Sequence, residues 1–395
     1  MADTSTTTTA TVPIDKSADF SLANPDTLTK YKTASEISAR VLASLKILCV
    51  DGANILELCA KGDSFLEEET AKVYKGKKFA KGIAFPTCIS PNHIVCHFSP
   101  LPSDPESQTT IKTGDLLKIS LGAQIDGFAG VLADTFVVPG DEDKVTGRRA
   151  DVLMAAYLAS EAAIRLIKPG AKNWEITDAV NTIAKAFDCS AVEGMLSHQQ
   201  ERNVIDGKKQ IILNPTEPQR REMSTHIFEE GEIYGVDILV STAEGKVRRV
   251  EARTTVFKKA DITYLLKLKA SRLVFSEIQK KFGAFPFTLR SLDDERKARM
   301  GVLECQQHGL LQPFDVLYEK DGEYVAQFFN TIALTKNGTV RLTGPPPLDL
   351  NRVTSEKTLM DDKLTTLIAS SLKPSSKKKN KKNSDKATAN GQASR

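Results

Sequence analysis

The spacing of apolar and polar residues along the chain predicts a mixture of strands and helices. Between Lys118 and Val138, apolar and small residues alternate on both sides of a glycine turn, which is typical of two antiparallel strands. Longer segments repeat apolar residues at the spacing of a helix that packs on a core. Helices are therefore expected over 28–50, 148–167 and 174–187, and over 64–74, where Ser64 and Glu67 form a capping box.

The second half of the chain continues with the same two patterns. A β-rich stretch runs from about Glu230 to Lys258, and a helical block follows from about Lys259 to Gly309. Two more strands lie in "GEYVAQFFNTIAL" and "GTVRLTG", and a short amphipathic helix is expected near Leu364. This order of elements predicts an α+β fold, in which the strands form a sheet and the helices cover one of its faces.

Composition divides the chain into three parts. Residues 1–25 are rich in Ser and Thr and are expected to be disordered, residues 26–345 form the folded domain, and residues 346–395 form a C-terminal extension with a disordered, lysine-rich tail. With 41% apolar and 26% charged residues, the chain resembles soluble globular proteins, and no apolar run is long enough to suggest a membrane span. The six cysteines lack C-x-x-C spacing, so buried, reduced thiols in a cytosolic or nuclear protein are expected.

The net charge of +4 is unevenly distributed. From Lys373 onward, seven lysines and Arg395 face one acid, Asp385, so this tail carries +7. The rest of the chain has 46 basic and 49 acidic residues and carries −3. A basic tail on a nearly neutral body favours a polyanionic partner, most often nucleic acid.

Several longer motifs resemble a known family. "KGIAFPTCISPNHIVCHFSP", "GMLSHQQERNVIDGKKQIILNP" and "PFTLRSLDDERKARMG" are similar to segments of the type 2 methionine aminopeptidases. They resemble more closely the proliferation-associated branch of that family, whose members bind ribosomes and nucleic acids. The resemblance extends from about Leu28 to Gly344. It implies the pita-bread fold, with the helical block of about 259–309 as an insert.

Active members of that family hold two divalent metal ions with two Asp, one His and two Glu side chains. The metals together generate the hydroxide that attacks the peptide bond. In this sequence the matching positions are Ser120, Val131, Ser197 or His198, Asp237 and Phe329. At most one carboxylate and one imidazole remain, which are too few to balance two dications. The resemblance therefore implies a protein with no metal cofactor and no peptidase activity.

Two nearby aspartates are not expected to replace the missing ligands. Asp126 directly precedes the turn glycine, and Asp134 lies three residues beyond Val131, so its side chain points to the opposite face of the strand. His97 matches a histidine that active enzymes use near the substrate, but without metals it is expected to have no catalytic role. An inherited pocket is then expected from His97, Ser120, Val131, His198, Asp237 and Phe329, with Asp237 and His198 forming a local polar pair.

The insert carries many basic residues. Its apolar residues Leu265, Leu268, Leu273, Phe275, Ile278 and Phe282 are expected to pack inward. The basic residues Lys267, Lys269, Arg272, Lys280, Lys281 and Arg290 are then expected to lie mainly on the solvent side. A charged helix face is more often simply solvated. The resemblance implies a further role, because in the relatives this insert docks on ribosomal RNA around the exit of the nascent-chain tunnel.

Lysines dominate the tail: Lys377, Lys378, Lys379, Lys381 and Lys382. Three roles are open for them: a solubilising segment, nuclear or nucleolar targeting, and binding to phosphate backbones. No aromatic residue lies among these lysines, so base stacking and strong sequence specificity are not expected. Before the tail, "LTTLI" departs from the L-x-x-L-L box of some relatives, so a helix that docks on the core is expected there instead of a receptor-binding motif.

Together these features predict a catalytically inactive, monomeric protein that binds structured RNA and the large ribosomal subunit near the tunnel exit. The predicted setting is ribosome biogenesis, translation and growth regulation, in the cytoplasm and the nucleus or nucleolus, without a membrane partner. Two alternatives remain. One is a nuclear DNA-binding protein or transcriptional co-regulator, and the other is an active metallo-aminopeptidase with altered ligands.

Overall fold

The protein is built around one large antiparallel sheet. The computed structural model describes residues 20–140, 144–250 and 252–372, and within them nine strands join in the order β1-β3-β4-β14-β8-β6-β7, with β15 on β14 and β5 on β8. In this order the strands are β1 Lys81–Pro91, β3 Leu116–Ile125, β4 Phe128–Val137, β14 Val325–Thr335, β8 Ile233–Ser241, β6 Leu196–Gln200 and β7 Gln210–Ile212, followed by β15 Gly338–Arg341 and β5 Ser190–Ala191.

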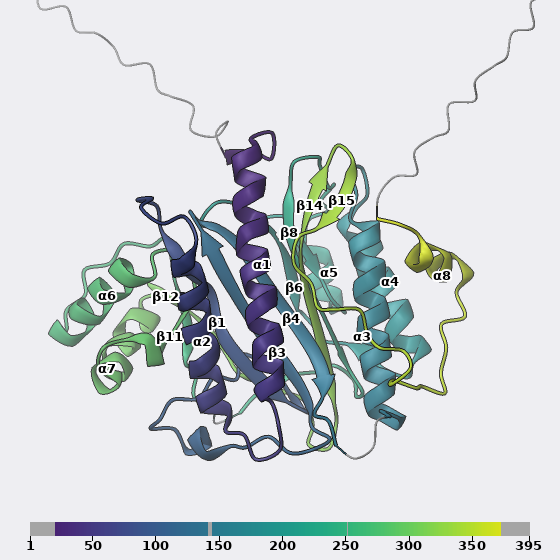
Figure 1. The fold of residues 1–395 in the computed structure, drawn as a ribbon, viewed down its shortest axis with the longest axis horizontal. Coiled ribbons are helices and arrows are strands. Elements are labelled where there is room, and N and C mark those ends of the chain that lie inside the picture. Colours follow the sequence, from purple (N-terminus) through teal and green to yellow (C-terminus); the bar gives the residue numbers. More distant parts are fainter. Residues whose placement is uncertain (1–19, 141–143, 251, 373–395) are drawn as a thin grey trace, which may run out of the picture.

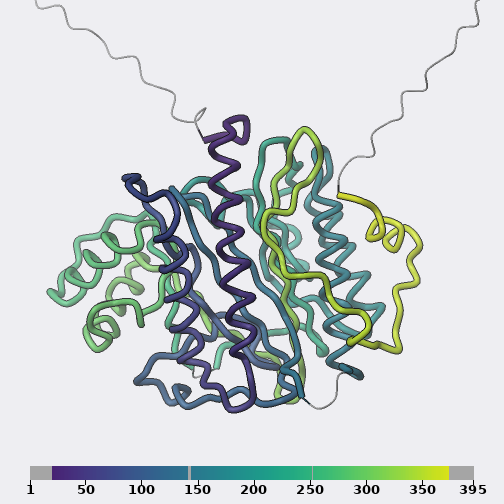
Figure 2. Tube along the Cα trace, in the orientation of Figure 1, coloured from purple at the N-terminus to yellow at the C-terminus, as the bar shows by residue number. Residues whose placement is uncertain are grey.

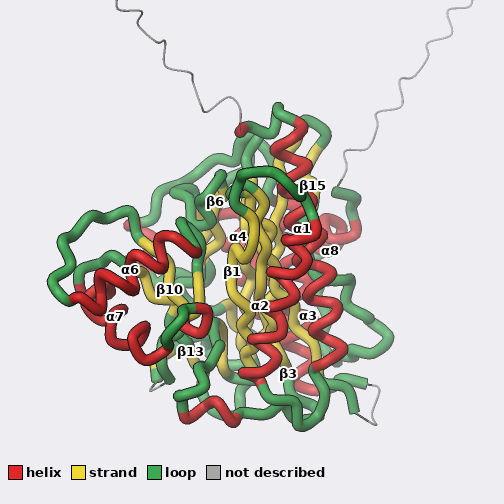
Figure 3. Tube along the Cα trace, turned by 60° about the vertical axis from the view of Figure 1, so that its left-hand side comes forward, coloured by secondary structure: helices red, strands yellow, loops and turns green. Residues whose placement is uncertain are grey.

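Four helices cover one face of this sheet (Figures 1 and 3). They are α1 Pro25–Leu48, α2 Ile55–Lys72, α3 Gly147–Leu166 and α4 Asn173–Ala186. Helices α1 and α2 pack on β1, β3 and β4, whereas α3 packs on β8 and β14 and against α4. Figure 2 shows the two helix pairs, which come from separate parts of the chain, beside each other over the sheet. The predicted α+β arrangement, with helices on one face of a sheet, is confirmed.

The buried core lies mainly between these helices and the sheet. All six cysteines are buried and none forms a disulfide, as predicted from their spacing. Among the described helices, none combines the length and the apolar character that crossing a membrane requires.

The hairpin of β3 and β4 forms where alternation predicted it. Ile125 pairs with Phe128, and the two turn residues between them, Asp126 and Gly127, have φ of 55° and 85°. Positive φ at both positions matches the twist of the flanking strands, and an Asp-Gly pair is among the sequences that tolerate it best. The turn aspartate is also fixed by ion pairs from Lys30 (2.7 Å) and Arg202 (2.6 Å).

The predicted start of the second helix is wrong. Helix α2 begins at Ile55, and the side chain of Asn54 caps it by accepting a hydrogen bond from the backbone N–H of Glu57. Ser64 lies within the helix and donates to Glu68. A glycine is required at position 62 of this helix, because a Cβ there would lie 2.5 Å from Oγ1 of Thr87 on β1. This close approach is a tertiary requirement, so local patterns give no sign of it.

The insert projects from one side of the molecule (Figures 1 and 3). Its two helices, α6 Lys269–Lys281 and α7 Glu295–Gln307, occupy the stretch where the sequence predicted helices. A three-stranded sheet, in the order β11-β10-β12, joins them to the body. Its strands are β10 Val256–Lys259, β11 Phe287–Thr288 and β12 Leu311–Phe314. A second small sheet has the order β2-β13-β9, with β2 Ile94–Cys96, β13 Leu317–Tyr318 and β9 Arg248–Arg249, and the short helix α5 spans Glu217–Glu222.

After β15 the chain crosses the outer side of α3. Val353 forms a parallel bridge with Val145, and helix α8 (Asp362–Ala369) packs on α3. Leu364, Leu367 and Ile368 are partly buried against the main core. The predicted amphipathic helix therefore exists and docks on the core.

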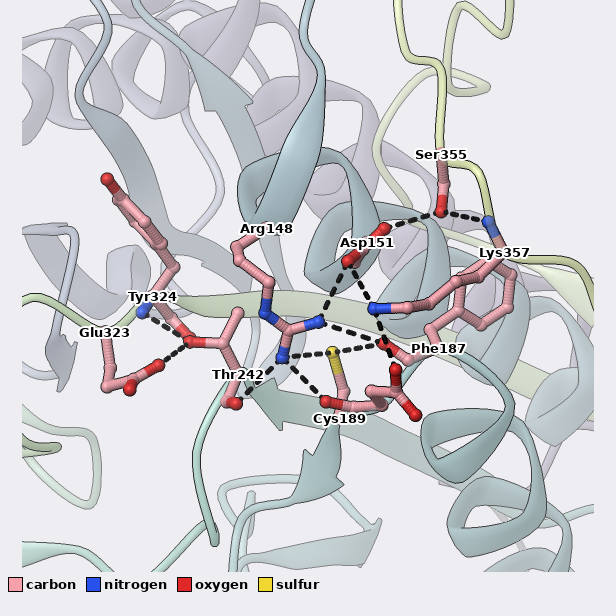
Figure 4. A network of polar contacts seen from close by, with 10 residues as sticks. Arg148, Asp151, Phe187, Cys189, Thr242, Glu323, Tyr324, Ser355 and Lys357 are labelled. Atoms are coloured by element: carbon pink, nitrogen blue, oxygen red, sulfur yellow. Dashed lines mark hydrogen bonds and ion pairs between the residues drawn. The ribbon is translucent and has the colours of Figure 1, made fainter.

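Asp151 on α3 ties the middle of this C-terminal segment to the body (Figure 4). Its Oδ1 accepts a hydrogen bond from Ser355 (2.6 Å), and its Oδ2 lies 2.8 Å from the nitrogens of both Arg148 and Lys357. The guanidinium and ammonium groups hold the pKa of the Asp151 carboxyl below its usual value, against the opposing effect of burial. One carboxylate thus joins the start of α3 to the C-terminal segment.

Replacing Asp151 with Asn is expected to lower the free energy of local opening of residues 346–372 by about 1–3 kcal/mol, because two cations and a hydroxyl lose a charged acceptor. Hydrogen–deuterium exchange should show faster exchange in this segment and little change elsewhere. Glu356→Gln, a charge change at an exposed neighbour in the same segment, is the matched control. Equal exchange in 346–372 for wild type and Asp151→Asn would contradict this function of the carboxylate.

Candidate functional site

A cavity of about 240 Å³ opens on the face of the main sheet opposite α1 and α2. Ser120 on β3, Val131 on β4 and Phe329 on β14 point into it. On the other face of β3 and β4, Ile119 and Leu132 are buried beneath the helices. The cavity and the helix-covered core therefore lie on opposite sides of the same strands.

The register of the sheet explains which residues meet in the cavity. Ser120 pairs with Ala133, Ala133 pairs with Phe329, and Phe329 pairs with Asp237, so one row crosses β3, β4, β14 and β8. Directly paired residues in an antiparallel sheet share a face. All six residues of the predicted pocket line this cavity: His97, Ser120, Val131, His198, Asp237 and Phe329. The structure also resolves the ambiguity on β6, because His198 borders the cavity and Ser197 Oγ accepts a hydrogen bond from the backbone N–H of Asp237.

Asp237 is the most perturbed acid in the cavity. Burial raises the pKa of its carboxyl to about 7, and the hydrogen bonds from Nε2 of Gln327 (2.9 and 3.1 Å) oppose that shift only in part. No cation is paired with Asp237 among the ion pairs of the described residues. The protonated form of this carboxyl therefore persists to a much higher pH than that of an ordinary aspartate.

The two histidines of the cavity are held by backbone carbonyls. Nδ1 of His198 lies 3.2 Å from the oxygen of Gly207, and Nδ1 of His97 lies 3.0 Å from the oxygen of Asp315. Burial lowers the pKa of both imidazoles. The predicted polar pair of Asp237 and His198 is wrong, because each side chain takes a different partner from its own neighbourhood.

The insert exposes most of the basic residues assigned to nucleic-acid binding. Lys267, Lys269, Arg272 and Lys280 are exposed on α6 and the loop before it. Arg272 also donates to the backbone oxygens of Leu266 and Lys267, which fixes the start of α6. Lys281 is exposed but is paired with Glu277 and Asp293, so it has less free charge to offer a partner.

The expectation that Arg290 lies on the solvent side is wrong. Its guanidinium donates to Asp63 on α2 at 2.6 Å, and it also donates to Ser99 and to the oxygen of Pro100. The side chains of Arg290 and Asp63 are only 12% and 10% exposed. Asp63 accepts a further hydrogen bond from the backbone N–H of Thr87 on β1. Arg290 is therefore an anchor between the insert and the body.

The predicted apolar face of the insert is also partly wrong. Leu265, Leu268 and Leu273 are exposed, while Ile278 is buried and Phe275 and Phe282 are partly buried. Helix α6 begins only at Lys269, so positions before it do not share its periodicity. The helix buries Ser271, Val274 and Ile278 instead.

The five tail lysines, Lys377, Lys378, Lys379, Lys381 and Lys382, lie outside the described residues. The described chain ends at 372, beside α8 and on the other side of the body from the insert (Figure 1). The tail and the insert therefore start from separate sides of the molecule.

Residues 29–257, more than half of the chain, match the sequence model of metallopeptidase family M24. The chain belongs to this family. The curved DNA-binding protein of Schizosaccharomyces pombe is 51% identical to this M24 protein over 374 residues, which cover 94% of this chain and 97% of that protein. Proliferation-associated protein A of Dictyostelium discoideum is 39% identical over 371 residues, or 93% of each chain.

A solved structure of a thermophilic Arx1 has a TM-score of 0.84 with this M24 protein at 39% identity. The match covers 88% of this chain and 99% of the other. Together with the two relatives, it confirms the predicted pita-bread fold and the predicted proliferation-associated branch. The printed names of the two relatives describe DNA binding and proliferation and not peptidase activity.

The M24 fold implies a pair of divalent metals in the cavity, and the side chains present do not fit them. Val131 and Phe329 have no donor atoms, and Ser120 offers only a neutral hydroxyl. Asp206 also borders the cavity, but it binds the ammonium of Lys258 at 2.5 and 2.6 Å. Within the described residues there is no group of three or more His, Cys, Asp or Glu arranged to hold a metal ion.

The two other aspartates near the cavity positions are engaged elsewhere. Asp134 faces α1 and pairs with Lys46 at 2.5 Å, on the side of the sheet opposite the cavity. Asp126 is held at the turn by its two cations. Both placements agree with the sequence-based expectations for these residues.

Sequence reasoning missed several residues that shape the cavity of this M24 protein. Gln327 binds Asp237, and Phe85 and Phe314 form aromatic walls beside His97, with ring centroids 5.9 and 5.2 Å from its imidazole. Alternation along β14 gives a signal for Gln327, because it lies two residues before Phe329 and so shares its face. Phe314 comes from a separate strand, and only the tertiary fold brings it to the cavity.

Proposed function

We propose that this M24 protein is a catalytically inactive relative of the aminopeptidases that binds structured RNA, with its principal site on the large ribosomal subunit near the tunnel exit. The observation that carries the first half is the row Ser120, Ala133, Phe329 and Asp237, which contains one carboxylate where the chemistry needs several. A pocket without ligands for two dications lacks the means to generate a metal-bound hydroxide.

The exposed cations support the second half of the proposal. Lys267, Lys269 and Lys280 are exposed, and their side-chain ammonium groups take part in none of the ion pairs or hydrogen bonds found in the described residues. Free ammonium groups on a projecting helix can contact phosphates, and the sequence of the tail adds further positive charge to the chain. We further propose that the protein is a monomer that acts in ribosome biogenesis, translation and growth regulation, in the cytoplasm and the nucleus or nucleolus.

The affinity for duplex RNA and for ribosomes is expected to fall steeply as salt rises. Lys267, Lys269 and Lys280 changed together to Gln should reduce the slope of log K against log salt by about 2–3, since each lost phosphate contact removes about 0.9. Fluorescence anisotropy across a salt series measures this slope. Removing residues 373–395 should flatten it further.

The matched control changes three exposed lysines on the α3–α4 side, Lys144, Lys168 and Lys185, to Gln. This variant has the same net charge as the insert variant but keeps the projecting helix unchanged. Sedimentation through sucrose should place the wild-type protein with large subunits at low salt and free of them at high salt. A salt-insensitive complex, or equal slopes for the two triple variants, would contradict the proposal.

A second candidate function is binding to DNA. The relative that is 51% identical over nearly the whole chain has the name curved DNA-binding protein. The same exposed cations would serve either nucleic acid, because phosphate contacts carry no sequence information. Competition between duplex RNA and bent DNA for the full chain distinguishes the two, and tighter binding of DNA at equal salt would favour this candidate.

A further inference from the structure

The insert has an exposed apolar surface in addition to its cations. Six large apolar side chains of this segment are more than half exposed, a concentration not found elsewhere in the described chain. They define the insert apolar face: Ile262, Leu265, Leu268, Leu273, Met300 and Leu303. Leu265 is 85% exposed and the other five are 53–61% exposed. Isolated exposed leucines are ordinary, but a group of them on one projection indicates an interaction surface.

Contacts between α6 and α7 place four of these residues next to positions where the two helices meet. Oε1 of Glu304 accepts from the backbone N–H of Lys267, and its Oε2 accepts from that of Leu268. Leu268 and Leu303 therefore flank one link between the helices. A Cβ at Gly301 would lie 2.7 Å from Val274, so the helices also approach closely there. Leu273 directly precedes Val274 in the chain, and Met300 directly precedes Gly301, so both lie next to this second contact.

Exposed cations lie on the same segment as the insert apolar face. Between residues 259 and 309 the chain has ten basic and six acidic residues, for a net charge of +4. Leu273 shares the exposed side of α6 with Lys269, Arg272 and Lys280. A partner that covers Leu273 therefore also meets these three cations.

The charge and the apolar residues together select among four kinds of occupant. A second copy of this chain would bring like charges together, which is unfavourable. RNA would satisfy the cations but has no aliphatic surface for leucines, since its exposed base faces favour aromatic and guanidinium groups. The lysine tail of this chain would add to the positive charge. An amphipathic helix with an apolar stripe flanked by acidic residues matches both features.

We propose that the insert apolar face is a docking site for an acidic amphipathic helix of a partner protein. The leucines contact the apolar stripe of the helix, and Lys269, Arg272 and Lys280 contact its acidic flanks. This inference goes beyond RNA binding and does not depend on it. Cations draw the partner in, and burial of the leucines gives the complex its dependence on sequence pattern.

The test uses the full chain and a labelled synthetic peptide of about 18 residues, with leucines at helical i, i+3, i+4 and i+7 spacing and glutamates between them. A second peptide has the same composition with the leucines spread around the helix. We expect micromolar binding of the first peptide, and binding at least about tenfold weaker for the second.

The variant Leu265→Gln with Leu273→Gln should also bind the first peptide at least about tenfold more weakly. Ile47→Gln with Val50→Gln is the matched control, because these side chains are 77% and 52% exposed but lie outside the insert, in the last turn of α1 and in the loop after it. Thermal melting checks that both variants stay folded. Affinity for duplex RNA, measured on the same proteins, should be unchanged by the leucine substitutions.

Three results would overturn the inference. Equal binding of the two peptides would mean that charge alone attracts them. No binding, or wild-type binding by the leucine variant, would exclude this class of partner at this face. Self-association of the wild type that disappears in the leucine variant would assign the face to a second copy, and weaker RNA binding by that variant would assign it to RNA. Each of these leaves the test of RNA binding by the lysine variants independent.

Discussion

Replacing Arg290 with Met is expected to destabilise the protein by about 3–5 kcal/mol, because it leaves the buried carboxylate of Asp63 without its cation. Burial disfavours a charged carboxylate, and the guanidinium provides the compensation together with hydrogen bonds to Ser99 and Pro100. Chemical denaturation followed by tryptophan fluorescence or circular dichroism measures the change in the free energy of unfolding. The loss should appear first in the insert, which Arg290 anchors to α2.

Two further variants show whether the ion pair causes the effect. Lys280→Met removes an exposed cation from the same insert and should change stability by less than about 0.5 kcal/mol. Asp63→Leu combined with Arg290→Met removes both charges and should recover part of the loss. A stability loss for Arg290→Met that matches that of Lys280→Met would contradict the assignment of Arg290 as an anchor. It would instead support the sequence-based prediction that Arg290 is a solvent-facing cation.

Changing Asp237 to Asn is expected to stabilise the protein above neutral pH by about 2–4 kcal/mol. Folding raises the pKa of Asp237 from 3.8 to about 7, so over this interval the unfolded chain releases a proton that the folded protein keeps. The free energy of unfolding of the wild type therefore falls as pH rises between these values, by up to about 1.4 kcal/mol per pH unit, and this contribution is constant above about 7. The Asn variant lacks the ionisable group and should lose this part of the pH dependence.

Asp134→Asn is a useful contrast, because burial also raises the pKa of that carboxyl but Lys46 lies 2.5 Å from it. Because Lys46 offsets part of the effect of burial, Asp134→Asn should gain less stability above neutral pH than Asp237→Asn. Denaturation curves across the pH range for the three proteins separate these effects. If the stability of Asp237→Asn depends on pH as that of the wild type does, the cost of ionising this buried carboxyl is offset by an interaction that the structure of the cavity does not show.

The sequence was sufficient for the elements that depend on local patterns. The β3–β4 hairpin combines strict alternation with an Asp-Gly turn, and α3 and α4 repeat apolar residues at helical spacing. The cavity residues were also predictable, since His97, Ser120 and Asp237 lie in motifs that match a known family. In each case the deciding information lies within a few residues of the position concerned.

The failures have long-range causes. Arg290 and Asp63 are 227 residues apart in the chain, and nothing near Arg290 distinguishes it from the exposed lysines of the same segment. Asp237 is bound by Gln327 and not by the nearer His198, because β14 and β8 are paired along their length. The leucines of the insert were predicted to pack inward, because the helical spacing of apolar residues does not show at which residue α6 begins.

The cavity and the insert lead to a consistent account. The chain belongs to family M24, while within the described residues no group of His, Cys, Asp and Glu side chains is arranged to hold a metal ion. The insert carries exposed cations and a group of exposed leucines, and the sequence ends in a lysine-rich segment. These features support the proposed binding to macromolecules.

The most direct test of this account is the metal content of the purified protein after equilibration with Mn²⁺ or Co²⁺ and removal of free ions. The account predicts far less than one bound metal ion per chain, because Ser120, Val131 and Phe329 offer the cavity only a hydroxyl and hydrocarbon groups. Two metal ions bound per chain in the cavity of Ser120, Val131 and Phe329 would contradict it and would restore the metallo-aminopeptidase alternative.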